Sequence, residues 1–275
     1  QIIFQEKDKA MPRIQECFEK LRNEGKSAFI AYMMGGDPDA ARSLALMKAL
    51  PGQGVDMIEL GMPFSDPMAD GPVIQRAGQR ALANGTSLDD ILGMVRSFRE
   101  ENTNTPVILM GYFNPVFHFG VEAFVTQCRE SGVDGLILVD LPPEEESEIT
   151  PFLKDSGIDL IRLITPTSDT QRIARIAQEA SGFLYLVSIT GITGTQSATA
   201  TDLEDIVISV RETSDLPVSI GFGISTAEQA REMAAIGDGI IAGSALVKAL
   251  EESEGDIKAY LDIAQTLASS AHNAA

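Results

Sequence analysis

A carboxylate inside an apolar strand is the first residue whose setting suits it to chemistry. Glu59 stands between Ile58 and Leu60 in a short apolar run. A carboxyl group in such a strand loses solvation, which raises its pKa and suits it to general acid/base catalysis. The alternative is a structural carboxylate paired with a backbone amide or an arginine. Because its apolar setting and its place at a strand end both favour function, we predict that Glu59 is catalytic.

A second carboxylate, Asp70, follows on a loop rich in proline and glycine. Such a loop can carry a side chain over the mouth of a barrel. Gly71-Pro72 then begins a helix, so Asp70 is equally well explained as a turn or N-cap residue. Asp66, on the same loop, is more typical of a residue that shapes the loop or contacts a partner. These residue types alone leave the role of Asp70 open.

Three glycine motifs in the second half of the chain indicate an anion site. They are Gly191-Ile-Thr-Gly194, Gly221-Phe-Gly-Ile-Ser225 and Ala242-Gly-Ser-Ala245. Glycines let backbone amides approach a ligand, and helix N-termini favour anions. Each motif alone is weak, because turn glycines are common. The last two follow successive apolar strands, as at the usual phosphate site of a (β/α)8 barrel. Neither matches a Walker lysine loop, so a nucleoside triphosphate is not indicated.

Composition argues against several other classes of function. The histidines (His118, His272) and cysteines (Cys17, Cys128) form no cluster with metal-ligand spacing, so we expect no metal and no cofactor. Lys248 lies within a helical segment, which argues against a Schiff-base role. A formal net charge of −19 disfavours nucleic acid. No apolar run approaches about 18 residues, so no membrane span is expected, and the low cysteine count is typical of the cytoplasm.

Eight short apolar runs must position these residues. The runs are nearly continuous rather than alternating, which is typical of parallel strands buried on both faces. Helical segments alternate with them, so we predict a (β/α)8 TIM barrel with its active site at the carboxyl ends of the strands. An open doubly wound sheet is the alternative, which the count of eight strands weakens. The predicted strands are Ala28–Met33, Met57–Leu60, Pro106–Met110, Gly135–Val139, Asp159–Ile164, Phe183–Val187, Pro217–Ile220 and Gly239–Ala242.

Two additions to the plain barrel are expected. Met11–Leu21 has the pattern of an extra amphipathic helix ahead of the first strand. Residues 61–105 leave room for a long loop and two helices, an insertion after the second strand. We expect residues 1–10 to be an N-terminal extension, of natural or cloning origin, and residues 11–275 to be a single catalytic domain.

Helix starts are also predicted. Asp37-Pro38 has the form of an N-cap followed by proline at the first helical position. Thr201–Glu204 and Ser225–Glu228 each fit the spacing of a capping box.

The loop from Glu59 to Pro72, Glu-Leu-Gly-Met-Pro-Phe-Ser-Asp-Pro-Met-Ala-Asp-Gly-Pro, resembles the signature of the tryptophan synthase alpha subunits. The resemblance extends from about Arg13 to the last helix. This loop with its two carboxylates is specific, whereas the phosphate loops are shared with many barrels. The other matching segments are Tyr32 with Gly36-Asp37-Pro38, Met110–Asn114, Asp140–Glu144, Ser188–Gly194 and Gly221–Ser225.

The resemblance implies a reaction and a partner. The family cleaves indole-3-glycerol phosphate to indole and glyceraldehyde 3-phosphate, without a cofactor, in tryptophan biosynthesis. The family's catalytic glutamate matches Glu59 and its catalytic aspartate matches Asp70, which would stabilise the indole N–H. Family members pass indole to a beta subunit, in a heterotetramer of two alpha and two beta subunits.

The resemblance also assigns further site residues by position. Those that would line the substrate are Tyr32, Ile74, Tyr112, Tyr185 and Thr193. Those that would bind the phosphate are Gly194, Phe222, Gly223, Gly243 and Ser244. Candidate partner contacts are Asp66, Pro67 and Asn114.

Two other functions stay open at this point. One is a regulatory subunit that has lost catalysis and only activates a beta-type partner, against which the intact Glu59 and Asp70 argue. The other is a different phosphate-binding barrel enzyme, such as an isomerase or a synthase, because a fold alone does not determine function.

Overall fold

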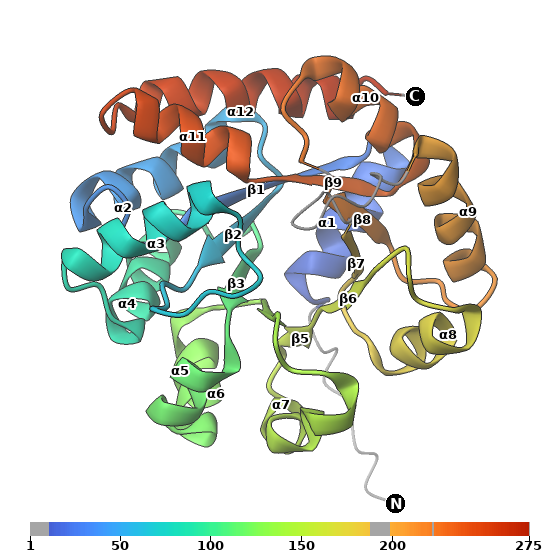
Figure 1. Ribbon diagram of the computed structural model, residues 1–275, viewed down its shortest axis with the longest axis horizontal. Coiled ribbons are helices and arrows are strands. Elements are labelled where there is room, and N and C mark those ends of the chain that lie inside the picture. The colour runs from blue at the N-terminus through green and yellow to red at the C-terminus, as the bar shows by residue number, and fades with distance from the viewer. Residues whose placement is uncertain (1–10, 188–198, 222, 275) are drawn as a thin grey trace, which may run out of the picture.

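Parallel strands form a ring at the centre of the molecule, and helices surround it (Figure 1). This computed structural model describes residues 11–187, 199–221 and 223–274. The strands are β1 (Ala28–Met34), β2 (Met57–Gly61), β3 (Val107–Gly111), β4 (Gly135–Leu138), β5 (Asp159–Leu160), β6 (Arg162–Ile164), β7 (Leu184–Val187), β8 (Val218–Gly221) and β9 (Gly239–Ala242). The helices are α1 (Arg13–Asn23), α2 (Ala40–Ala49), α3 (Pro72–Ala83), α4 (Leu88–Arg99), α5 (Phe113–Phe119), α6 (Val121–Ser131), α7 (Thr150–Leu153), α8 (Thr170–Glu179), α9 (Ala200–Arg211), α10 (Ala227–Ile236), α11 (Ser244–Glu252) and α12 (Ile257–His272), with short 3-10 helices η1 (Leu50–Gln53) and η2 (Pro143–Glu148). The predicted barrel fold is confirmed.

One extended segment closes the ring. The hydrogen-bonded order is β5-β4-β3-β2-β1-β9-β8-β7-β6, with β5 and β6 at its two ends. β5 pairs with β4, β6 pairs with β7, and Ile161 alone separates β5 from β6. The fifth predicted strand, Asp159–Ile164, is therefore two short strands, because each half pairs with a different neighbour.

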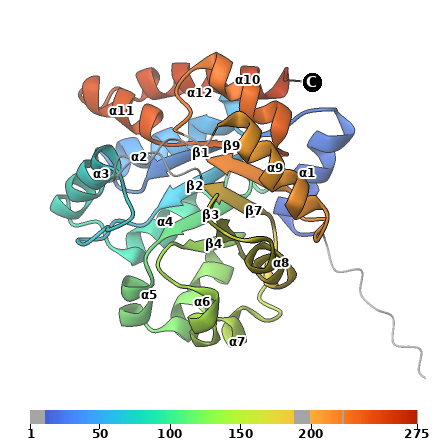
Figure 2. The same ribbon diagram turned by 45° about the vertical axis from the view of Figure 1, so that its right-hand side comes forward.

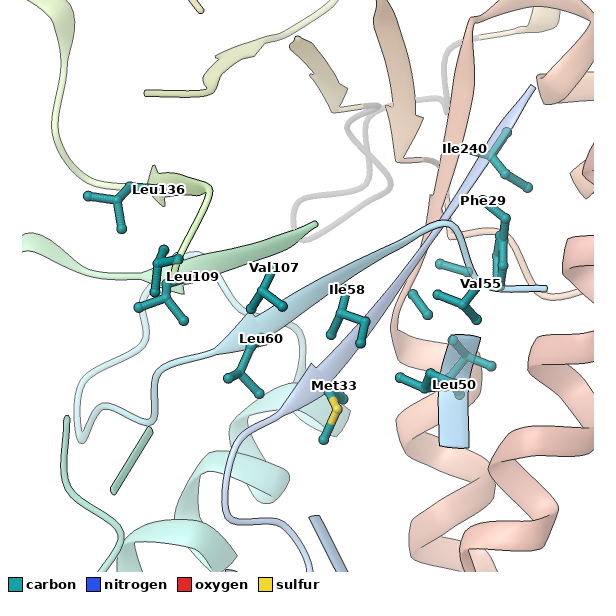
Figure 3. Close-up of a cluster of buried hydrophobic side chains, with 14 of the residues drawn as sticks. Phe29, Met33, Leu50, Val55, Ile58, Leu60, Val107, Leu109, Leu136 and Ile240 are labelled. Atoms are coloured by element: carbon teal, nitrogen blue, oxygen red, sulfur yellow. The ribbon is translucent and has the colours of Figure 1, made fainter. Parts of the chain in front are cut away.

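The strands bury side chains on both faces, as their apolar sequences predict. Ile30 and Met57 belong to the cluster that fills the barrel. Phe29, Ile58 and Leu60 belong to the larger cluster between the strands and the surrounding helices (Figure 3). Because side chains alternate along a strand, Glu59 shares the inward face with Met57. The fold thus directs this carboxyl group into the barrel.

Helix α1 covers the amino-terminal end of the barrel. Ile14, Phe18 and Leu21 are buried in the interior cluster, and the Phe18 ring lies 5.7 Å from that of Phe183. Figure 2 shows α1 and α3 on opposite sides of the strand ring. The predicted extra helix is confirmed, and the opposite end of the barrel is left for a site.

The insertion after β2 contains α3 and α4, as predicted. Helix α3 starts at Pro72, the first helical position, where a missing N–H costs no helical hydrogen bond. Among the described residues, no helix is long and apolar enough to cross a membrane.

The prediction that Asp37 caps α2 is wrong. The cap is Asp39, whose side chain accepts a hydrogen bond from the Arg42 N–H. Asp37 is only 1% exposed, and its carboxylate receives the two N–H groups of Arg80 at 2.7 and 2.9 Å. A contact with a residue 43 positions away thus outweighs the local capping pattern.

The two predicted capping boxes are displaced. α9 has its box at Thr199–Asp202 rather than Thr201–Glu204, and α10 has its box at Thr226–Gln229 rather than Ser225–Glu228. Aspartate and glutamine at the third helical position accept the backbone N–H of the cap as well as glutamate does, so the sequence offers several nearly equivalent registers.

Candidate active site

Glu59 is a buried carboxyl group without a hydrogen-bond partner among the described residues. Its side chain is 1% exposed, and neither Oε1 nor Oε2 receives a hydrogen bond from that part of the chain. Burial raises the pKa of Glu59 to about 8, and the negative charge of Asp70 adds to the rise. The alternative of a carboxylate paired with an amide or an arginine therefore finds no support there. At neutral pH Glu59 holds a proton.

Asp70 lies on the loop between β2 and α3, half-buried. The Tyr112 hydroxyl donates to its Oδ1 at 3.1 Å and accepts the Ala69 N–H at 2.9 Å. Burial raises the pKa of Asp70 to about 6, and the hydrogen bond from Tyr112 opposes this rise. The cap of α3 is Gly71, so the Asp70 side chain does not cap that helix. Asp70 is therefore mostly ionised at neutral pH, in contrast to Glu59.

Two tyrosines share the inward face with these carboxyl groups. Tyr32 on β1 lies opposite Glu59 in the sheet register. Burial raises the pKa of Tyr32 well above its usual value, and the charges of Asp70 and Glu59 contribute. Burial likewise raises the pKa of Tyr185 on β7, with a contribution from Glu59. Both hydroxyls therefore remain protonated and are available as hydrogen-bond donors.

Apolar groups complete this end of the barrel. Ile74, in the first turn of α3, packs against a small cluster that contains Tyr32 and Met34. The Phe64 ring lies 5.3 Å from that of Tyr112. The structure thus brings together the predicted residues Glu59, Asp70, Tyr32, Ile74, Tyr112 and Tyr185 at one end of the barrel.

Two glycines make room for the tyrosines, a role that the sequence-based prediction did not assign to them. A Cβ added to Gly61 would lie 2.3 Å from the Tyr32 hydroxyl oxygen. A Cβ added to Gly221 would lie 2.5 Å from the Tyr185 hydroxyl oxygen. Both glycines end a strand, and a glycine in a strand often marks close approach of another group. That signal was present in the sequence, but it does not reveal which side chain approaches.

Of the predicted phosphate-binding residues, Gly223, Gly243 and Ser244 follow two neighbouring strands, β8 and β9. β8 pairs with β9, so the loops after them are adjacent. Gly223 has φ +48°, in the left-handed region, and Ser244 is the first residue of α11. A Cβ on Gly243 would lie 3.2 Å from the Tyr32 Cβ, which places this loop next to the carboxyl end of β1. Three other predicted residues, Thr193, Gly194 and Phe222, lie outside the described residues.

The predicted partner contacts are on two linked segments, the loop after β2 and helix α5. Asp66 and Asn114 are exposed and Pro67 is partly exposed. The hydrogen bond from Ala69 to Tyr112 joins the loop after β2 to the start of α5. Two large apolar side chains that were not predicted lie on the same two segments, one on the loop after β2 and one on helix α5. These are Met68, 80% exposed, and Phe117, 60% exposed.

Groups suited to other chemistry lie elsewhere. Within residues 11–187, 199–221 and 223–274, no group of three or more His, Cys, Asp or Glu side chains could hold a metal ion. Lys248 pairs with Glu252 on the exposed side of α11, at 3.6 Å, and His118 is exposed.

Comparison with known proteins places this arrangement in a family. A model of the tryptophan synthase alpha chain family matches residues 18–275. The tryptophan synthase subunit alpha of Legionella pneumophila is 40% identical with a TM-score of 0.87, covering 95% of this chain and 98% of that one. A structure of Mycobacterium tuberculosis tryptophan synthase, in an open form with BRD0059 bound, is 34% identical with a TM-score of 0.85, covering 94% and 98%.

A structure from Aquifex aeolicus VF5 is 38% identical with a TM-score of 0.88, covering 96% of this chain and 100% of that one. These matches run over nearly the whole barrel and exclude an unrelated phosphate-binding barrel enzyme. The chain belongs to the tryptophan synthase alpha chain family and is a lyase of tryptophan biosynthesis that releases indole from indole-3-glycerol phosphate.

Proposed function

We propose that Glu59 is the acid and base of this cleavage. The observation that carries the proposal is its buried carboxyl group, which has no hydrogen-bond partner among the described residues. Cleavage of the carbon–carbon bond needs a proton on indole C3, so that the bonding electrons can return to the ring as the bond breaks. Glu59 delivers that proton. Its carboxylate then takes the proton of the glycerol hydroxyl, which becomes the aldehyde of glyceraldehyde 3-phosphate.

Asp70 supports the same step from the other side of the ring. As a carboxylate it accepts a hydrogen bond from the indole N–H and stabilises the positive charge that develops on protonation at C3. Tyr112 holds Asp70 in place through the hydrogen bond to Oδ1. The different surroundings of the two carboxyl groups thus suit one to be an acid and the other an anion.

The phosphate group orients the substrate. We assign it to the ends of β8 and β9, where Gly223, Gly243 and Ser244 offer backbone amides and a hydroxyl at the start of α11. Thr193, Gly194 and Phe222 are assigned to the substrate and its phosphate by position in the family's pattern. Tyr32, Ile74, Tyr112 and Tyr185 line the indole and glycerol parts. Binding of the phosphate holds the indole ring in a fixed orientation relative to Glu59 and Asp70.

The two carboxyl groups predict a bell-shaped dependence of kcat/KM on pH. The acid must be protonated, so activity falls as pH rises through the Glu59 pKa of about 8. The carboxylate must be ionised, so activity falls as pH drops through the Asp70 pKa of about 6. We therefore expect a maximum between these values, measured as initial rates of indole release from pH 5 to 9.5. A rate that still rises beyond pH 9 would contradict the role of Glu59 as an acid.

We further propose that the loop after β2 and helix α5, which follows β3, bind a tryptophan synthase beta subunit, in a heterotetramer of two alpha and two beta subunits. Met68 and Phe117 expose apolar surface there, beside the polar side chains of Asp66 and Asn114. Exposed apolar groups bordered by polar ones are typical of protein–protein contacts. The Ala69 N–H donates a hydrogen bond to the Tyr112 hydroxyl. A partner that displaces this surface would therefore also displace the loop that carries Asp70.

Indole release by the purified chain tests the proposal, with and without an added tryptophan synthase beta subunit. We expect multiple turnovers from the chain alone and a higher rate with the partner. Replacing Met68 with Ser should reduce this stimulation while the rate of the isolated chain is maintained. A chain that stimulates the partner but releases no indole would instead be a regulatory subunit.

A further inference from the structure

Four charged side chains on the outside of the barrel form a network that we call the ion cluster: Asp37, Arg76, Arg80 and Glu251. Arg80 donates to both oxygens of Asp37, at 2.7 and 2.9 Å, and its third nitrogen donates to Glu251 at 2.6 Å. Arg76 donates to both oxygens of Glu251, at 2.8 and 2.7 Å. The cluster therefore joins three segments: the loop after β1, helix α3 and helix α11.

Each of these segments leads into the site. Asp37 follows β1, which carries Tyr32. Helix α3 begins two positions after Asp70, and the Gln75 side chain in its first turns donates to the Asp70 carbonyl at 2.9 Å. Helix α11 begins at Ser244 and packs against α3 (Figure 1). The cluster thus lies between the helix attached to Asp70 and the helix that starts at the phosphate end.

The geometry of the cluster is more tightly defined than that of an ordinary surface ion pair. Asp37 is 1% exposed, and the Arg80 side chain is 32% exposed. Arg76 and Arg80 hold the pKa of Glu251 down to about 2. Two-pronged contacts between a guanidinium and a carboxylate fix orientation as well as distance. By comparison, Lys248 and Glu252, on the same helix, form a single exposed contact of 3.6 Å.

We infer that the ion cluster sets the spacing between Asp70 and the phosphate end at Gly243 and Ser244, so that Arg80 and Glu251 are positioning residues for the cleavage. The inference rests on the proposed roles of Asp70 and the phosphate loops. One substrate molecule must contact Asp70 and the phosphate end at the same time. A rigid connection between α3 and α11 keeps these two parts of the site at a constant distance. Neither Arg80 nor Glu251 needs to touch the substrate for this role.

The test compares Glu251→Gln with Glu252→Gln, the same change at the neighbouring position of α11. Glu251→Gln removes the charge that both arginines share but leaves Asp37 paired with Arg80, so the buried carboxylate keeps its partner. We expect kcat/KM for indole-3-glycerol phosphate to fall about 5- to 20-fold in Glu251→Gln, because small errors in placement have large effects on rate. Glu252→Gln should stay within about twofold of the parent, as is usual for an exposed pair.

Binding of the two halves of the substrate separates positioning from other effects. The affinities of indole alone and of glycerol 3-phosphate alone, measured by calorimetry, should change less than about twofold in Glu251→Gln, because each half needs only one end of the site. Arg80→Lys keeps the positive charge, but a lysine ammonium cannot bridge Asp37 and Glu251 as the planar guanidinium does. The kcat/KM of Arg80→Lys should therefore lie between that of the parent and that of Arg80→Gln.

Two results would overturn the inference. One is an unchanged kcat/KM in Glu251→Gln. The other is a loss of affinity for glycerol 3-phosphate as large as the loss of kcat/KM, which would indicate a direct effect on the phosphate end. Failure of the proposed function gives a different result, namely a parent chain that releases no indole.

Discussion

Replacement of Glu59 by glutamine is expected to lower kcat for indole release by about 10²- to 10⁴-fold, the usual contribution of a positioned acid and base. Glutamine matches glutamate in size but can neither deliver a proton to indole C3 nor accept one from the glycerol hydroxyl. Steady-state kinetics of the purified variant at pH 7 measure the effect. Glu252→Gln, on the exposed side of α11, is the matched control.

Stability distinguishes lost chemistry from lost structure in this variant. Glu59 is buried without a hydrogen-bond partner among the described residues, and its raised pKa means that folding disfavours its ionised form. An amide removes that pH-dependent cost, which accumulates between the pKa of an unfolded glutamate, 4.5, and the folded pKa of about 8. The free energy of unfolding of Glu59→Gln should therefore be close to that of the parent at pH 5 and should exceed it clearly at pH 8.5. Urea titrations at both pH values measure this. Near-normal turnover, or a large loss of stability at pH 7, would argue against the assigned role.

Replacement of Asp70 by asparagine is expected to lower kcat by about 10²- to 10³-fold, with a smaller effect on KM. The amide oxygen can still accept the hydrogen bond that Tyr112 gives to Oδ1, so the loop should keep its place. What is lost is the negative charge that stabilises the protonated ring. Kinetics over a range of substrate concentrations separate kcat from KM.

The pH profile gives an independent check on Asp70. Ionisation of Asp70, with its pKa of about 6, accounts for the acid limb of the parent profile. In Asp70→Asn the residual activity should therefore no longer fall between pH 7 and pH 5, while the alkaline fall persists but moves to lower pH, because the charge of Asp70 no longer raises the pKa of Glu59. An acid limb that remains unchanged in the variant would assign that limb to another group.

The strands and Glu59 could be predicted because their signals are local. An apolar run of five residues has few alternatives to a buried strand, and a glutamate within it is conspicuous. The division of Asp159–Ile164 into β5 and β6 could not be predicted, because it depends on which neighbour each half pairs with. Strand pairing is a property of the closed ring, not of the six residues.

Side-chain contacts between residues far apart in the sequence could not be predicted either. The hydrogen bond from Tyr112 to Asp70 joins residues 42 positions apart, and Asp37 meets Arg80 across 43. From residue types alone, Asp70 was equally well explained as a turn or cap residue, and Asp37 was assigned to the wrong helix cap. The resemblance to a family supplied the role of Asp70. It did not supply the physical reason, which is the half-buried position beside Tyr112.

The contact between Tyr32 and Gly61 restricts the order in which this site can change during evolution. The Tyr32 hydroxyl occupies the space that a side chain at position 61 would need. The Cβ of Tyr32 lies close to the place where a side chain at position 243 would begin. A larger residue at 61 is therefore accessible only after position 32 has become smaller. Libraries that vary these positions one at a time would miss such combinations, whereas libraries that vary 32, 61 and 243 together would sample them.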